Sequence, residues 1–179
     1  MDINLLKNET LLKINILNNF DKVIHGLKSK INWDNSIISR KTASFGVPYN
    51  YSNIKYDKNE IPSFLNDLIK IVYSENNFLP NNCLINYYHN NLSKMGYHSD
   101  QIDILAKDTG VVIFSFGATR ILRFKNKIDN NLIYDFELKN NSYFYMSQEV
   151  QKHWLHSILP DTSSLKSERY SITFRRILE

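Results

Sequence analysis

The chain has 179 residues, 42% of them hydrophobic, and a formal net charge of +4 at pH 7. This length and apolar content predict a single globular domain over residues 1–179 and exclude a disordered chain or a fibre. No apolar run reaches the roughly 18 residues that a membrane-spanning helix needs, so we expect no membrane contact. The mild basic excess is compatible with a polyanionic partner.

Cysteine content and the N-terminal residues indicate the compartment. The single cysteine, Cys83, excludes an intramolecular disulfide framework and a multi-cysteine zinc site. The first residues lack the basic region and the long apolar region of a secretory signal. We therefore expect an intracellular protein in the cytoplasm or the nucleus, where thiols stay reduced.

Two segments of the N-terminal half carry apolar residues at intervals of three and four, the spacing of an amphipathic helix. The first predicted helix covers Leu17–Ile31. The second begins near Pro62, a residue suited to the first turn of a helix, and continues to about Val72. The N-terminal third is therefore predicted to be helical.

After Pro80 the pattern changes to short apolar and aromatic runs of strand length, separated by turn residues. Helices followed by seven or eight short strands predict an α+β fold whose strands form a sandwich or jelly roll. The predicted strands are Cys83–Tyr88, Val111–Phe116, Ile121–Lys125, Leu132–Leu138, Tyr143–Met146, Trp154–Ile158 and Tyr170–Ile177.

Three side chains are candidate metal ligands. His98 and Asp100 are two residues apart, so in an extended segment they point to the same face and can bind one ion together. A histidine from another strand would complete a two-histidine, one-carboxylate set, the arrangement of non-haem Fe(II) oxygenases. We prefer His156 to His153, which would face the other side of a strand. The alternative is that the His-x-Asp tripeptide is a surface accident.

The last predicted strand places two arginines on one face. Alternation puts Arg169, Ser171, Thr173 and Arg175 on one side, and apolar or aromatic residues on the other. Two guanidinium groups directed into a barrel form a receptor for a dicarboxylate, since arginine binds carboxylates in a bidentate way. The alternative is an exposed edge strand with solvated charges.

Seven short motifs follow one another along the chain: Arg40–Gly46, Tyr49–Tyr51, Asn86–Tyr88, Tyr97–Asp100, Ser115–Gly117, Met146–His156 and Arg169–Arg175. Their order and spacing resemble the AlkB family of Fe(II)- and 2-oxoglutarate-dependent nucleic-acid demethylases, and the first two resemble its animal DNA-repair members. The resemblance covers residues 20–178 and implies a double-stranded β-helix, or jelly-roll, core. This catalytic core would occupy about residues 81–179, and residues 1–80 would form a helical, nucleotide-recognition part.

The same resemblance implies roles for the residues of the core. His98, Asp100 and His156 would be the catalytic iron ligands. Arg169 would pair with the far carboxylate of 2-oxoglutarate, and Arg175 would lie by the carboxylate next to its keto group. Three further residues would complete this co-substrate shell: Asn86, Tyr88 and Ser171, the last standing where the family usually has asparagine.

Contacts with the nucleobase are implied for three further residues. Tyr51 would stack on a flipped base, and Tyr49 would lie at the rim of the same pocket. After Asp100 the family often has carboxylates that accept hydrogen bonds from a base amine, but here Gln101 and Ile102 follow. Because an amide both donates and accepts, Gln101 would relax the selectivity for 1-methyladenine and 3-methylcytosine over 3-methylthymine or 3-methyluracil.

The activity implied by the resemblance is oxidative removal of N-alkyl groups from alkylated DNA or RNA, with Fe(II) and with 2-oxoglutarate and O₂ as co-substrates. Only six residues separate Trp33 from Arg40, too few for a duplex-wedging hairpin, so we expect a preference for single strands. We expect a monomer. Two alternatives remain open: a 2-oxoglutarate-dependent hydroxylase of a protein or small molecule, and a catalytically silent nucleic-acid-binding domain.

Overall fold

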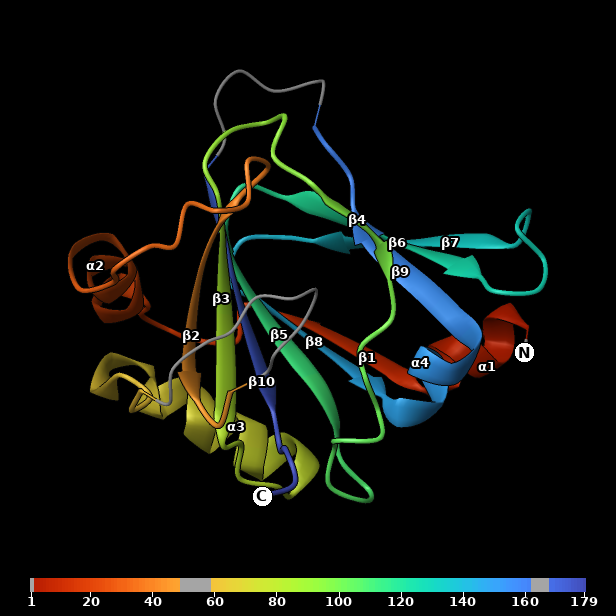
Figure 1. Ribbon diagram of the computed structural model, residues 1–179, viewed down its shortest axis with the longest axis horizontal. Helices are drawn as coiled ribbons and strands as arrows, with labels where there is room; N and C mark the ends of the chain where they lie inside the picture. Colours follow the sequence, from red (N-terminus) through yellow and green to blue (C-terminus); the bar gives the residue numbers. More distant parts are fainter. Residues whose placement is uncertain (1, 49–58, 162–167) are drawn as a thin grey trace.

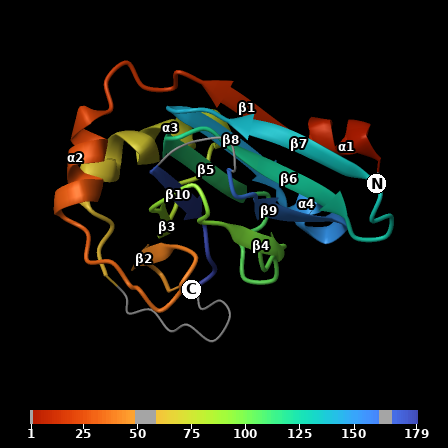
Figure 2. The same cartoon turned by 90° about the horizontal axis from the view of Figure 1, so that it is seen from above.

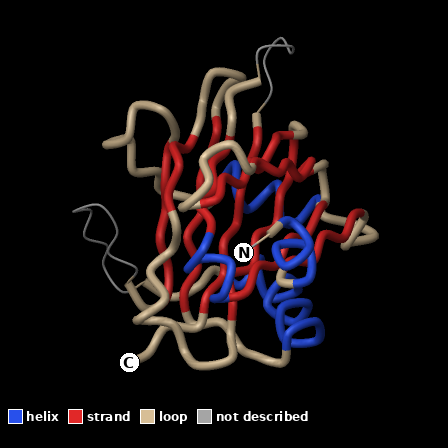
Figure 3. Tube along the Cα trace, turned by 90° about the vertical axis from the view of Figure 1, so that its right-hand side faces the viewer, coloured by secondary structure: helices blue, strands red, loops and turns tan. Residues whose placement is uncertain are grey.

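The computed structural model describes residues 2–48, 59–161 and 168–179 (Figure 1). Strands form most of the body of the molecule, and the helices lie at its periphery (Figure 3). In chain order the elements are α1 (Ile3–Asn8), β1 (Thr10–Ile14), α2 (Asp21–Ser29), β2 (Lys41–Gly46), the 3-10 turn η1 (Ser63–Leu65), α3 (Asn66–Asn76), β3 (Asn82–Tyr88), β4 (Met95–His98), β5 (Gly110–Gly117), β6 (Arg120–Asn126), β7 (Ile133–Leu138), β8 (Ser142–Ser147), α4 (Gln148–His153), β9 (Trp154–Ile158) and β10 (Arg169–Arg175).

Two antiparallel sheets make up the core. The large sheet has the order β1-β8-β5-β10-β3-β2, and the small sheet has the order β4-β9-β6-β7. Helices α2 and α3 lie against the side of the large sheet that faces away from the small one (Figure 2). This jelly-roll arrangement confirms the predicted α+β fold.

Side-chain alternation in the central strands divides the buried residues into two clusters. In β5, Val111 and Ile113 pack between the two sheets, together with Leu122 and Phe124 of β6. The alternate residue Phe114 points to the opposite face, where it joins the cluster beneath the helices. Because both faces of the central strands are covered, β5 and β10 are buried along nearly their whole length.

The predicted strands after Pro80 are all present, with ends that differ by one or two residues. The helix predicted over Leu17–Ile31 is present but shorter, as α2. The helix predicted from Pro62 is present as η1 followed by α3.

A wholly helical N-terminal third is wrong, because β1 and β2 form the two edges of the large sheet. β1 pairs with β8, more than a hundred residues away, and β2 pairs with β3. Neither segment has a strong alternating pattern of its own, so distant backbone hydrogen bonds decide its conformation. No helix among the described residues is long and apolar enough to cross a membrane.

Candidate active site

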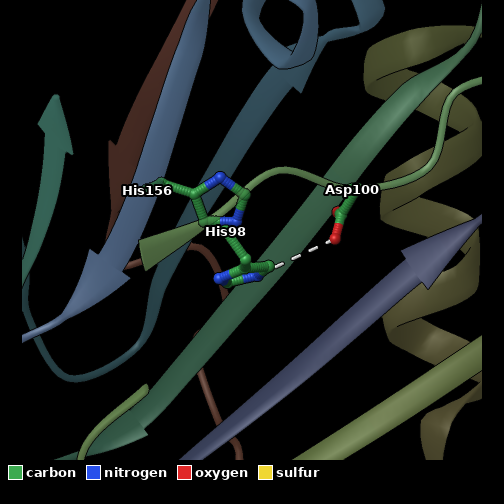
Figure 4. Close-up of side chains that lie close together, drawn as sticks. All are labelled: His98, Asp100 and His156. Atoms are coloured by element: carbon green, nitrogen blue, oxygen red, sulfur yellow. Dashed lines mark ion pairs between the residues drawn. The ribbon is translucent and has the colours of Figure 1, made fainter. Parts of the chain in front are cut away.

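His98, Asp100 and His156 come together between the two sheets. His98 ends β4 and lies directly opposite His156 of β9 in the antiparallel pairing, while Asp100 follows β4 in a loop. Potential ligand atoms of the three side chains all lie within 4.8 Å of one another. His98 Nε2 is 3.9 Å from Asp100 Oδ1, and the two imidazole centroids are 4.2 Å apart (Figure 4). The three residues form a candidate metal site.

The protonation states of this group suit a metal ion. Burial lowers the pKa of His156 to about 3, with a further lowering from His98, and burial also lowers the pKa of His98. Burial alone would raise the pKa of Asp100, but Arg175 and the two histidines outweigh it and hold that pKa below its ordinary value. At neutral pH the site therefore offers two neutral imidazoles and one carboxylate, the ligand types that Fe(II) accepts.

One hydrogen bond orients the first histidine. His98 Nδ1 lies 3.0 Å from the carbonyl oxygen of Gly96. With the Nδ1 proton donated to that carbonyl, Nε2 is the nitrogen left to bind a metal, an arrangement common in metal sites. His156 Nδ1 is buried and has no hydrogen-bond partner in the part of the chain that the structure describes.

His153 does not belong to this group. It is the last residue of α4, and its Nε2 lies 3.0 Å from Glu149 Oε1, one helical turn back. The preference for His156 agrees with this position, but the reason given from the sequence was wrong. His153 is separated from the site because it ends a helix, not because it faces the other side of a strand.

A small cavity borders the metal-binding group. Its polar lining comes chiefly from the two neighbouring strands β3 and β10: Asn86, Tyr88, Ser171, Thr173 and Arg175. Three of the four alternating residues of β10, namely Ser171, Thr173 and Arg175, therefore face the cavity as predicted, whereas Arg169 is buried but does not line it. The intervening Tyr170, Ile172 and Phe174 belong to the cluster beneath the helices. The edge-strand alternative is excluded because β10 lies between β5 and β3.

Arg175 joins this cavity to the metal-binding group. Its Nη2 donates to Asp100 Oδ2 at 3.0 Å, and both side chains are almost fully buried. Its Nη1 lies 3.5 Å from Asn82 Oδ1. Arg175 therefore holds one carboxylate oxygen of Asp100 and places a positive charge beside the cavity.

Arg169 is buried with part of its donor set unsatisfied. Its Nε donates to Ser115 Oγ at 2.8 Å, and its guanidinium lies 5.0 Å from the Tyr88 ring centroid. Nη1 and Nη2 are buried without a hydrogen-bond partner among the described residues. Buried polar groups are almost always hydrogen-bonded, so this fork fits a ligand carboxylate. Burial lowers the pKa of Arg169 from its ordinary value, and Tyr88 partly opposes that change.

Arg40 is a site residue that sequence reasoning did not single out. It precedes β2, in which Thr42 lies opposite Asn86 of β3. Arg40 Nε donates to Asn86 Oδ1 at 2.8 Å, so the carboxamide of Asn86 is oriented with its nitrogen away from Arg40. The signal available in the sequence was the position of Arg40 at the start of a motif, but only the β2–β3 pairing brings it to Asn86, which lines the cavity.

The structure does not place the residues expected to contact a nucleobase in the lining of the cavity. Gln101 follows Asp100 directly, is exposed, and is not among the residues that line the cavity. Tyr49 and Tyr51 lie outside the described residues. Their expected contacts with a base stay predictions.

Residues 20–175 match the family described as the 2OG-Fe(II) oxygenase superfamily. Over 155 residues the chain is 28% identical to bovine "DNA oxidative demethylase ALKBH2", covering 79% of this chain and 54% of that protein. It is also 28% identical over 148 residues to bovine "Alpha-ketoglutarate-dependent dioxygenase alkB homolog 3", covering 77% and 51%. A mimivirus protein, "Uncharacterized protein R406", is 33% identical over 94 residues, or 52% of this chain and 48% of its own length. The chain spans about half the length of the curated relatives it matches.

A solved structure supports the same fold. OsALKBH1 superimposes with a TM-score of 0.69 at 17% sequence identity, over 94% of this chain and 98% of that one. The family match and the metal-binding group are those of the 2-oxoglutarate- and Fe(II)-dependent oxygenases, and the solved structure shows the same fold. This chain belongs to the 2OG-Fe(II) oxygenase superfamily. Its similarity to ALKBH2 and to alkB homolog 3 supports the resemblance to the AlkB family.

Fe(II), 2-oxoglutarate and O₂ are accordingly the cofactor and co-substrates of this enzyme class, and the residues present fit them. The donor set of two imidazoles and a carboxylate suits Fe(II) and leaves coordination positions for other ligands. The unsatisfied fork of Arg169 suits a carboxylate of 2-oxoglutarate. When bound, iron and 2-oxoglutarate supply the oxidising power of the reaction.

Proposed function

We propose that this protein is an oxidative demethylase that removes N-alkyl groups from nucleobases in DNA or RNA. The observation that carries the proposal is the meeting of His98, Asp100 and His156 beside a cavity that the buried Arg175 lines. Among its relatives, the proteins named as a DNA oxidative demethylase and as alkB homolog 3 support the choice of a nucleobase substrate.

In this proposal the residues divide into two groups around the iron. His98, Asp100 and His156 bind the metal. The co-substrate group anchors 2-oxoglutarate: Arg169 and Arg175 bind its two carboxylates, with Asn86, Tyr88 and Ser171 completing the shell. Arg169 is the more deeply buried of the two arginines, and its Nη1 and Nη2 have no hydrogen-bond partner among the described residues, so they can donate to a carboxylate.

In this proposal the nucleobase reaches the metal-binding group and is contacted by Tyr51, Tyr49 and Gln101. The base must leave its stack to reach the iron, which costs least in a single strand. Asp34 forms an isolated antiparallel bridge with Thr42, and residues 35–40 between them contain a bend and a turn but no strand. This supports the absence of a wedging hairpin, and we propose a preference for single-stranded DNA or RNA.

The test is mass spectrometry of methylated oligonucleotides incubated with Fe(II), ascorbate and 2-oxoglutarate. The panel carries 1-methyladenine, 3-methylcytosine, 3-methylthymine or 3-methyluracil in one sequence, single-stranded or in a matched duplex. We expect loss of the methyl group with release of formaldehyde, faster on single strands, and no reaction with Asp100→Ala. Turnover of 2-oxoglutarate without demethylation of any lesion would contradict the proposal and favour a protein or small-molecule substrate.

A further inference from the structure

Asp100 lies in a segment that the sheets do not hold. β4 ends at His98, and its pairing with β9 is irregular between Met95 and His98. Residues 99–102 belong to no helix or strand. A candidate metal ligand in such a loop needs other contacts to keep its position, because no ladder of backbone hydrogen bonds fixes it.

Gln151 of α4 supplies one of these contacts. Its Oε1 accepts a hydrogen bond from the backbone N–H of Asp100 at 2.9 Å, and the side chain is 2% exposed. Gln151 lies in α4, which runs directly into β9 and so toward His156. The backbone of one candidate ligand is therefore tied to the element that carries another.

Lys127 supplies a second contact, from the end of β6. Its Nζ donates to Ser99 Oγ at 3.1 Å and to the backbone oxygen of Gln151 at 2.7 Å. Its backbone N–H donates to the oxygen of His153 at 2.9 Å. One lysine thus connects the residue between His98 and Asp100 to the end of α4.

We propose that Lys127 and Gln151 form a brace that positions Asp100 against His98 and His156 for metal binding. Both are positioning residues, since neither belongs to the metal-binding group. The inference rests on the proposed metal-binding role of His98, Asp100 and His156. Arg175 fixes the carboxylate of Asp100, while the brace fixes its backbone and the neighbouring Ser99.

Geometry and charge predict opposite results when Lys127 is replaced. Its positive charge repels a cation at the site, and the same charge contributes to the low pKa of His156. If charge dominated, Lys127→Met would tighten metal binding. If the brace dominates, the same variant weakens it, and loss of an outer contact of this kind typically costs 10- to 100-fold in metal affinity.

The experiment is a titration of the metal-free protein with Co(II), followed by visible absorption, without 2-oxoglutarate or nucleic acid. The variants are Lys127→Met, Gln151→Met, the double variant and Lys127→Arg. Lys152→Met is the matched control, because Lys152 lies in α4 beside Gln151 but pairs with Glu149 at the surface. Thermal unfolding of each metal-free variant separates a loss of fold from a loss of affinity.

We expect each single brace variant to bind Co(II) roughly 10- to 100-fold more weakly. We also expect a changed absorption spectrum of bound Co(II), and partial rescue of the affinity by Lys127→Arg. The double variant should bind Co(II) more weakly than either single variant, but its fold-loss in affinity should be smaller than the product of the two single fold-losses. Unchanged or tighter binding in folded Lys127→Met and Gln151→Met would overturn the brace. Absence of Co(II) binding in the wild-type protein would overturn the metal site itself, and with it the proposed function.

Discussion

At the scale of single residues, burial is what makes the arginines of β10 specific for a carboxylate. A guanidinium at the surface is satisfied by water, whereas that of Arg169 is fully buried and has two nitrogen atoms without a partner among the described residues. Ser115 and Tyr88 hold the rest of the group in place. The arrangement is preorganised for a planar anion, and a carboxylate matches it in shape and charge.

Replacing Arg169 with alanine is therefore expected to raise the 2-oxoglutarate requirement steeply. Loss of one partner of a desolvated charge pair costs about 2–5 kcal/mol. That corresponds to roughly 30- to 5000-fold in affinity at about 1.4 kcal/mol per decade. The measurement is the 2-oxoglutarate dependence of succinate formation, with Co(II) binding recorded in parallel to confirm that the metal site is preserved.

Arg123→Ala is the control for this prediction. Arg123 is half-exposed and its guanidinium pairs with Asp135 on the outer side of the small sheet. We expect its removal to leave the 2-oxoglutarate requirement unchanged. An equal effect of the two variants would mean that Arg169 acts through stability or net charge and not through a carboxylate contact.

Replacing His156 and replacing His153 are expected to have different effects on metal binding. His156→Ala removes a buried imidazole from the metal-binding group and abolishes Co(II) binding. His153→Ala removes an imidazole that pairs with Glu149 at the surface, so metal binding persists. Loss of Co(II) binding in His153→Ala, with binding kept in His156→Ala, would show that His153 and not His156 is the metal ligand.

At the scale of elements, one buried arginine fastens the loops at one end of the jelly roll. Arg120, at the start of β6, is 2% exposed and donates to four backbone carbonyls. Three belong to the β3–β4 connection, at Asn90, Asn91 and Ser93, and the fourth belongs to Leu159 after β9. Elements from both sheets are thus held together by a single guanidinium.

Arg120→Met is expected to destabilise the fold more than a surface substitution. The variant keeps most of the side-chain volume but removes the donor of one buried and three part-buried carbonyls, and a buried unsatisfied group costs about 1–3 kcal/mol. The measurement is the free energy of unfolding in urea. Arg123→Met, which breaks a surface pair, is expected to cost at most about 1 kcal/mol. Equal losses in the two variants would show that the four carbonyls find other donors.

At the scale of the whole molecule, the buried histidine makes stability depend on pH. In the folded metal-free protein the pKa of His156 is lowered to about 3 from an ordinary value of 6.5. Between these values the unfolded chain binds a proton at this position that the folded chain excludes. The free energy of unfolding therefore falls as the pH falls through this window.

This pH dependence is expected to decrease when His156 is replaced. One proton corresponds to a slope of about 1.4 kcal/mol per pH unit, and His156→Gln removes that contribution. The measurement is urea unfolding in the presence of a chelator at a series of pH values across the window. His25→Gln, outside the buried clusters, is the control and is expected to keep the wild-type slope. An unchanged slope in His156→Gln would contradict the low pKa.

Much of the core and the candidate site was readable from the sequence because those features are local. Alternation along β10 predicted which residues of that strand face inward, and the two-residue spacing of His98 and Asp100 predicted their shared face. Strand-length apolar runs located the strands after Pro80 to within one or two residues, except for the short strand β4, which was not predicted. Each of these features depends on the period of the backbone, which a single segment carries in its own side chains.

Only the tertiary structure decided the features that depend on distant pairing. β1 and β2 are strands because β8 and β3 offer them hydrogen bonds, and Arg40 reaches Asn86 only through the β2–β3 register. The contacts of Lys127 and Gln151 with the Asp100 segment likewise join residues that are 28 and 51 positions apart. No local period encodes such contacts, because they form only when the whole sheet has closed around its core.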